Sequence, residues 1–144
     1  FVMYSRKESK RVREEFWICF GKNYHRKWLL YNTRIKDFSL KFTFTRKFAE
    51  VSIDLDSTDE IMRQYYFEKL QSLKTILKEG FLPDAAFDEV YELENRKIIS
   101  RVYVSKESVN IHNKKDWPVA QEWLTEKMDA LERFFLKYRD FIEQ

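Results

Sequence analysis

Glycine and proline are scarce in this chain of 144 residues, which contains two of each. Average proteins contain roughly 7% glycine and 5% proline. Glycine-rich phosphate loops of the Walker and Rossmann types need more glycine than this, and so does a collagen-like repeat. A β-sandwich with many tight turns is excluded for the same reason.

Cysteine and histidine are also scarce, with a single cysteine and two histidines. One cysteine cannot form an internal disulfide, and these three residues are too few for a dedicated zinc site, so we expect no metal and no cofactor. No apolar run approaches the ~20 residues that span a bilayer, and no signal-peptide-like segment opens the sequence. We therefore expect a reduced, cytoplasmic protein without a membrane partner.

Aromatic and charged residues, in contrast, are abundant. Aromatic residues make up 17% of the chain, all hydrophobic residues 44% and charged residues 35%. Such a composition is not that of a disordered chain and can supply a hydrophobic core. The length corresponds to one domain, so we expect residues 1–144 to form a single domain.

Hydrophobic periodicity of about 3.6 residues predicts three helices, over residues 5–21, 57–80 and 116–142. The first begins with a capping box formed by Ser5 and Glu8. Such a box satisfies backbone N–H groups that have no partner in the first helical turn.

The ends of the other two helices carry signals of their own. Ser57 or Thr58 is the expected N-cap of the second helix, and Gly80 is its expected C-cap. The third helix begins at Asp116, with Pro118 in its first turn.

Five segments predict β-strands. Alternation of apolar and polar residues over 38–45 and 49–55 indicates an antiparallel hairpin with one dry face and one solvated face. The short apolar run 28–31 fits a buried strand, and segments 87–93 and 98–104 form a further pair. The predicted order is α-β-β-β-α-β-β-α, an α+β fold with a mainly antiparallel sheet of about five strands and three helices.

The net charge of +3 is unevenly distributed. Residues 1–50 contain thirteen Lys and Arg against five Asp and Glu, whereas residues 51–144 contain fourteen against nineteen. Basic side chains dominate affinity for nucleic acids, so Arg6, Lys10 and Arg13 are candidate nucleic-acid-binding residues. The alternative is that they form the solvated face of the first helix.

The predicted element order also matches nucleases with a PD-(D/E)xK motif. In these enzymes two carboxylates hold Mg²⁺ and a lysine two positions after the second helps to activate water. Asp37 and Glu50 are weak candidates for the carboxylates, but Ser52 stands where the lysine belongs. The alternative is a hairpin whose solvated face carries ordinary cross-strand pairs.

Four aromatic residues of the second and third helices are candidates for a protein interface. Each has a large apolar neighbour in the sequence, and consecutive helical residues cannot all face one core. Exposed aromatic rings are typical interface anchors, although a second stripe could instead complete a thick core. The four candidates are Tyr65, Trp123, Phe134 and Phe141.

Five stretches spread over nearly the whole chain carry a family resemblance. They are Tyr4–Ser9 with Phe16-Trp17, Trp28–Phe38, Tyr65–Leu70 with Leu73–Thr75, Lys97–Tyr103, and Asn113–Pro118. Through them the chain resembles a bacterial family that is catalogued only as a domain of unknown function. Longer relatives carry a similar segment behind a predicted restriction-endonuclease-like domain. The resemblance implies proximity to DNA metabolism or defence and no established activity.

These observations together predict a non-enzymatic α+β interaction module, accessory to DNA metabolism or defence, that contacts a protein partner or a second copy of itself. Two alternatives stay open. One is a nucleic-acid-binding protein, and the other is a divergent or degenerate Mg²⁺-dependent nuclease of the PD-(D/E)xK type.

Overall fold

The structure, a computed structural model, describes residues 4–144. Its main elements are α1 (Arg6–Asn23), β1 (Phe38–Phe44), β2 (Phe48–Leu55), α2 (Glu60–Ser72), α3 (Lys74–Gly80), β3 (Ala86–Glu92), β4 (Ile98–Glu107), the short 3₁₀ helix η1 (Lys114–Asp116) and α4 (Trp117–Glu143). The capping box predicted at the start of α1 is present, because the Ser5 hydroxyl accepts a hydrogen bond from the Glu8 N–H and donates one to its carboxylate.

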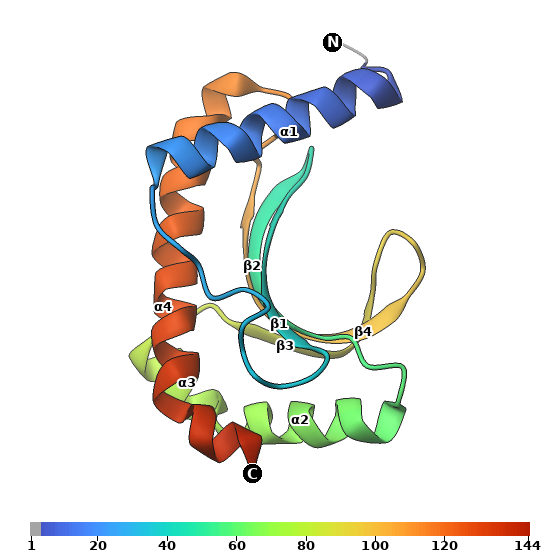
Figure 1. Cartoon of the computed structure of the whole chain (residues 1–144), viewed down its shortest axis with the longest axis vertical. Coiled ribbons are helices and arrows are strands. Elements are labelled where there is room, and N and C mark those ends of the chain that lie inside the picture. The colour runs from blue at the N-terminus through green and yellow to red at the C-terminus, as the bar shows by residue number, and fades with distance from the viewer. Residues whose placement is uncertain (1–3) are drawn as a thin grey trace.

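The four strands form one sheet in the order β1-β2-β4-β3, and all neighbours are antiparallel. The predicted α+β class and the mainly antiparallel sheet are therefore confirmed. The predicted counts are wrong, since the described residues contain four strands rather than five and four α-helices rather than three. The sheet is strongly curved, with α4 along its convex side and α1 and α2 at its two ends (Figure 1).

The hydrophobic core lies on the convex side of the sheet. Alternate residues of β2, from Ala49 to Leu55, point toward α4 and are almost completely buried. The stripe predicted on the last helix meets them, and most of its members are buried. Burial of this apolar area is the main source of stability of the fold. The buried stripe residues are Leu124, Met128, Leu131, Phe135 and Ile142.

The segment 28–31 is not a strand, contrary to the prediction. The Leu29 N–H donates to the Glu132 carboxylate of α4 at 2.6 Å, so it is not available to a sheet. Leu30 adopts a positive φ of 46°, which an extended strand does not allow. This segment instead turns beside the start of β1, where the Leu40 N–H donates to the Leu30 carbonyl.

The predicted second helix is two helices, α2 and α3, that meet at Leu73. The Ser72 hydroxyl donates to the Lys69 carbonyl, the acceptor that the Leu73 N–H would use in a continuous helix. The N-cap of α2 is Asp59 rather than Ser57 or Thr58, and its carboxylate accepts from two backbone N–H groups. Gly80 is the last residue of α3 rather than its cap, which is Phe81.

Candidate functional site

The concave face of the sheet is polar and holds buried charges. In β2 the residues Glu50, Ser52 and Asp54 alternate with the core residues and therefore point away from α4. Asp54 lies opposite Arg101 of β4, and Glu50 lies opposite Ser105. The sequence predicted a solvated face here, and this prediction is wrong, because all three β2 residues are buried.

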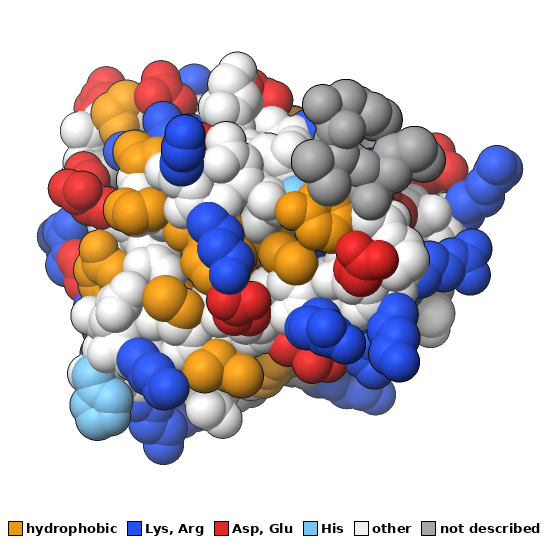
Figure 2. Space-filling model, turned by 90° about the horizontal axis from the view of Figure 1, so that it is seen from above, with side chains coloured by type: hydrophobic (Ala, Val, Ile, Leu, Met, Phe, Trp, Pro, Cys, Tyr) orange, Lys and Arg blue, Asp and Glu red, His pale blue; other side chains and the backbone are white. Residues whose placement is uncertain are grey.

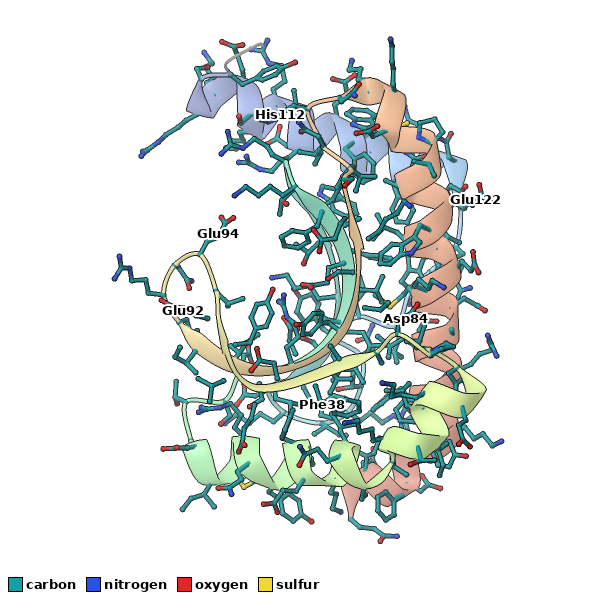
Figure 3. The ribbon with its side chains drawn as sticks, turned by 180° about the vertical axis from the view of Figure 1, so that it is seen from behind. Phe38, Asp84, Glu92, Glu94, His112 and Glu122 are labelled. Atoms are coloured by element: carbon teal, nitrogen blue, oxygen red, sulfur yellow. The ribbon has the colours of Figure 1, made fainter. Side chains whose placement is uncertain are left out.

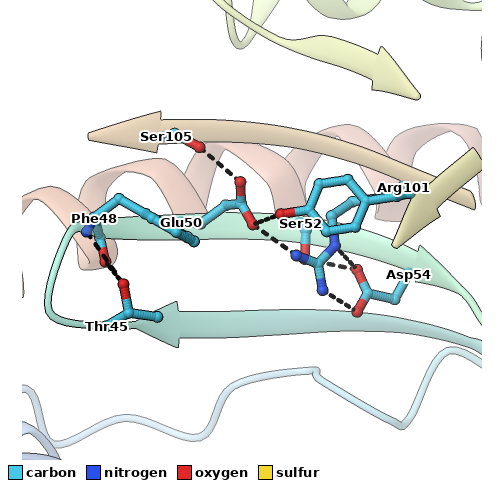
Figure 4. A network of polar contacts seen from close by, with 8 residues as sticks. Thr45, Phe48, Glu50, Ser52, Asp54, Arg101 and Ser105 are labelled. Atoms are coloured by element: carbon cyan, nitrogen blue, oxygen red, sulfur yellow. Dashed lines mark hydrogen bonds and ion pairs between the residues drawn. The ribbon is translucent and has the colours of Figure 1, made fainter. Parts of the chain in front are cut away.

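Arg101 joins the two carboxylates of β2 (Figure 4). Its guanidinium donates to Glu50 at 2.6 Å and to both carboxylate oxygens of Asp54 at 2.8 Å. The hydroxyls of Ser105 and Tyr91 also donate to Glu50, at 2.6 and 3.3 Å. The three charged side chains are only 2–7% exposed, so the network is a buried clamp between β2 and β4.

Burial raises the pKa of Glu50 above its ordinary value, although Ser105 and Arg101 act in the opposite direction. Burial also works to lower the pKa of Arg101, but its bonds to Asp54 and its attraction to Glu50 leave that pKa raised. Arg101 thus stays charged while it occupies oxygens of both carboxylates. Within residues 4–144 no cluster of three or more His, Cys, Asp or Glu is placed to hold a metal ion.

Asp37 lies far from Glu50 along the sheet. Its carbonyl accepts from the Asp56 N–H at one end of the β1–β2 hairpin, while Glu50 pairs with Thr43 near the other end. The separation is six residues of β2, or roughly 20 Å of strand. The two carboxylates proposed for a nuclease are therefore not brought together, and Asp37 borders a separate small cavity beside α2.

Two hollows open on the concave side. The larger, of about 890 Å³, lies between α1 and the β1–β2 turn, and the other, of about 480 Å³, lies between β1 and the β3–β4 hairpin. Thr45 and Glu94 line both hollows. We treat the two together as one feature and call it the groove.

One side of the groove is basic. Arg6, Lys10 and Arg13 follow each other at helical spacing on α1 and all line the larger hollow, together with Arg46 from the β1–β2 turn. We call these four residues the basic wall. Among residues 4–144 only Lys10 of this set has an ion-pair partner, Glu14 at 4.0 Å. Figure 2, which looks onto the α1 end, shows Lys and Arg side chains spread over it with Asp and Glu between them.

His112 lies at the same hollow, next to Tyr4. The two ring centroids are 4.3 Å apart, and the Tyr4 hydroxyl donates to the His112 carbonyl. Burial lowers the pKa of His112, and the nearby positive charges of Arg46 and Arg13 lower it further. The histidine is therefore neutral at pH 7, and part of the decrease in its pKa comes from the positive charges of the basic wall.

The opposite side of the groove is the β3–β4 hairpin, which carries carboxylates. Glu92 and Glu94 project from it, as Figure 3 shows, and both line the groove. At its base a bulge between Asp88 and Tyr91 shifts the register of β3. The bulge turns the Tyr91 ring toward the concave face, where it packs 4.3 Å from the Arg101 guanidinium.

The four predicted interface aromatics have different surroundings. The prediction that Phe134 lies at the surface is wrong, because this residue is fully buried and packs against Phe81 with 5.5 Å between ring centroids. Trp123 is half-buried against the core. Tyr65 and Phe141 are 42% and 41% exposed. Their role at an interface stays a prediction.

Three residues of the groove are predicted by the sequence, and others are not. Arg6, Lys10 and Arg13 were predicted as one basic helical face, and the structure places all three at one hollow. Arg46 and His112 lack any such signal, since they come close to α1 only through the folded chain. Arg46 lies between the strands predicted over 38–45 and 49–55, and this position in a turn indicates exposure but not proximity to α1.

Comparisons with known proteins give one match. A family model described as "Domain of unknown function (DUF4268)" matches residues 12–139. No curated protein and no solved structure matches the chain significantly. Within residues 4–144 no helix combines the length and the apolar content that crossing a membrane requires.

Proposed function

This chain belongs to the DUF4268 family, a domain of unknown function, and from that premise we propose that it is a non-enzymatic module that binds nucleic acid in the groove. One observation carries the proposal. Arg6, Lys10 and Arg13 of α1 and Arg46 of a distant turn line a single hollow of about 890 Å³. If the basic residues of α1 were only its solvated face, there would be no reason for Arg46 of another element to line the same hollow.

The charges of the basic wall are available to phosphates. In the described part of the chain, Arg6, Arg13 and Arg46 have no carboxylate within ion-pair distance. Arginine presents several N–H donors in a planar fork that matches phosphate oxygens. Binding to phosphates also releases counterions from the nucleic acid, and this release supplies much of the affinity.

A nuclease activity has less support from the site. Glu50 is held by Arg101, Ser105 and Tyr91, and Asp37 is six strand positions away. A Mg²⁺ site needs converging oxygen ligands that are free to bind the ion. Binding without cleavage therefore agrees better with the geometry. The link to DNA metabolism or defence that the family resemblance implies is consistent with this function and stays a prediction.

The test is a binding titration with fluorescently labelled oligonucleotides at several salt concentrations. The R6A/K10A/R13A variant is expected to lose most of the affinity, because three phosphate contacts are removed. The slope of log K against log salt should also become shallower by about 2 for a single strand, at roughly 0.7 per contact.

A matched control also removes three positive charges from α1, at positions outside the groove. Lys7, Arg11 and Lys22 are exposed and do not line the groove. The K7A/R11A/K22A variant should therefore keep nearly all of the affinity. If both triple variants weaken binding equally, or if the unchanged protein binds no nucleic acid, the proposal is wrong.

Protein contact is a second candidate, favoured by apolar side chains exposed on α2 and at the end of α4. Ile61 is 78% exposed, and Tyr65 and Phe141 are each about two-fifths exposed. Exposed apolar patches of this kind mark interaction surfaces. Light scattering that detects a dimer, which I61S converts to a monomer, would support self-association. A monomer at every concentration would exclude it.

A further inference from the structure

The groove has basic side chains on one side and carboxylates on the other, and this arrangement of charge favours one class of nucleic acid. We infer that the groove selects single-stranded over double-stranded nucleic acid, with the phosphates along the basic wall and the base edges toward the carboxylates of the β3–β4 hairpin. The inference rests on the proposed function and adds to it the class of ligand.

Glu92 and Glu94 of the β3–β4 hairpin form the acidic wall of the groove, which faces the basic wall across the larger hollow. Glu94 lines that hollow together with the four basic residues, and it also lines the second hollow with Glu92 and Asn95. Arg96 and Lys97 belong to the same turn but do not line either hollow. The hairpin therefore presents negative charge to the groove (Figure 3).

The two walls do not neutralise each other. Over residues 4–144, neither Glu92 nor Glu94 has a cation within ion-pair distance. The hollow between Glu94 and the basic wall is open, with a volume of about 890 Å³. A ligand in the larger hollow therefore meets free positive charge on the α1 side and the free carboxylate of Glu94 on the hairpin side. The second hollow has Glu92 and Glu94 on its hairpin side and the exposed Lys41 on its β1 side, which leaves the hairpin as the acidic side of both hollows.

A duplex does not fit this charge pattern. Both of its phosphate backbones lie on the outside of the double helix, so a duplex seated against the basic wall brings its second backbone toward the hairpin. Carboxylates repel phosphates, and the repulsion is strongest where water is partly excluded. A single strand has its phosphates on one side and its bases on the other, so it can satisfy both walls.

The bases would lie in the second hollow. Carboxylates accept hydrogen bonds from amino groups such as N4 of cytosine, whereas thymine offers no amino group. The Tyr91 ring lines this hollow and packs against the Arg101 guanidinium, 4.3 Å from the ring centroid, and against the Tyr103 ring in a T-shaped arrangement with 5.4 Å between centroids. A fixed aromatic ring is a stacking surface for an unpaired base. Cytosine is therefore preferred over thymine.

The experiment compares three labelled probes of equal length: oligo-dC, oligo-dT and a mixed-sequence duplex. The unchanged protein is expected to bind oligo-dC roughly tenfold more tightly than the duplex, and oligo-dT with intermediate affinity. In the E92Q/E94Q variant, duplex affinity should rise by several-fold more than oligo-dC affinity, and the preference for dC over dT should shrink.

A matched control changes the same charge outside the groove. Glu122 and Glu126 are exposed on α4, and neither lines the groove. The E122Q/E126Q variant should leave the ratio of single-strand to duplex affinity unchanged. Circular dichroism of both variants checks that the fold is retained, which is expected because all four side chains are at the surface.

The outcomes separate this inference from the proposed function. Equal binding of single strand and duplex, both dependent on Arg6, Lys10 and Arg13, would overturn the inference and leave nucleic-acid binding in place. The inference would also be overturned if E92Q/E94Q and E122Q/E126Q raised the affinity for all three probes equally, because the effect would then come from the net charge of the protein and not from the groove. No binding of any probe would overturn the proposed function and the inference with it.

Discussion

At the scale of single residues, the concave face of the sheet depends on how its charges are paired. Arg101 is buried between Glu50 and Asp54 and donates hydrogen bonds to both carboxyl groups. His112, in contrast, lies beside Arg13 and Arg46 with no carboxylate among the groups that shift its pKa. The buried network joins β2 to β4, whereas His112 lies at the larger hollow among positive charges.

Replacement of Arg101 by methionine is expected to destabilise the protein by about 3–5 kcal/mol, because two buried carboxylates lose their cation. Urea unfolding measures this loss. R11M is the control, since Arg11 is exposed on α1 and its replacement should change the free energy of unfolding by no more than about 0.5 kcal/mol. Equal stabilities of R101M and R11M would show that the clamp contributes nothing.

Nucleic-acid binding should tighten as the pH falls below 6.5, the ordinary pKa of histidine. Burial and the charges of Arg46 and Arg13 lower the pKa of His112, so it is neutral at pH 7 and gains a proton only in more acidic solution. A bound phosphate favours the charged form, so binding takes up a proton. One added charge contact strengthens binding by roughly two- to fivefold.

The check is a binding titration from pH 8 to pH 5. H112N should bind with an affinity that is nearly independent of pH. H25N is the control, because His25 is exposed in the segment after α1 and does not line the groove, and it should keep the pH dependence. A pH profile that is the same in H112N and in the unchanged protein would contradict this role of His112.

At the scale of elements, α4 contacts a segment that is about 100 residues away in the sequence, the stretch between α1 and β1. One of its residues, Glu132, accepts from the Leu29 N–H and pairs with Arg26 at 2.6 Å. This contact holds the segment 24–37 in an irregular course that covers part of β1. It also explains why α4 carries a buried carboxylate within its apolar stripe.

Replacement of Glu132 by alanine should loosen the segment 24–37, because a charged hydrogen bond and an ion pair are lost together. The local opening free energy is expected to fall by about 1.5–3 kcal/mol. Hydrogen exchange measures the change as faster exchange in this segment, with β2 and β4 unaffected. D129A is the control, since Asp129 also pairs with Arg26 but is 42% exposed. Similar exchange in both variants would rule out a special role for Glu132.

At the scale of the whole molecule, one core on the convex side of the sheet joins the first helix to the last. Phe16 of α1 packs against Trp117 of α4 with 5.2 Å between ring centroids, and Phe38 of β1 packs against Phe135 at 5.3 Å. Contacts of this kind link segments that are about 100 residues apart in sequence. The prediction that residues 1–144 form a single domain is consistent with them.

We expect unfolding in urea to be one cooperative transition. Trp17 and Trp28 report on the N-terminal third, and Trp117 and Trp123 report on α4, so tryptophan fluorescence samples both ends of the fold. Its transition should coincide with that of the helical circular dichroism signal. Two separate midpoints would show that the chain unfolds as two units.

Local sequence signals predicted the features that depend on nearby residues. The capping box of Ser5 and Glu8, the β1–β2 hairpin and the apolar stripe of α4 are each set by residues within a few positions of one another. The same holds for the basic face of α1, where Arg6, Lys10 and Arg13 lie together because the helix repeats every 3.6 residues. For these features the sequence was sufficient.

Tertiary structure decided the rest. Glu50 and Asp54 have the alternating positions of solvated residues, yet both are buried against Arg101, about fifty residues later. Tyr91 and Ser105 also cover Glu50. In the same way, only the curvature of the sheet and the path of the hairpin bring Glu94 opposite the basic face of α1. The physical reason is that helix and strand periods fix which way a side chain points, whereas the partner that it meets depends on how distant segments pack.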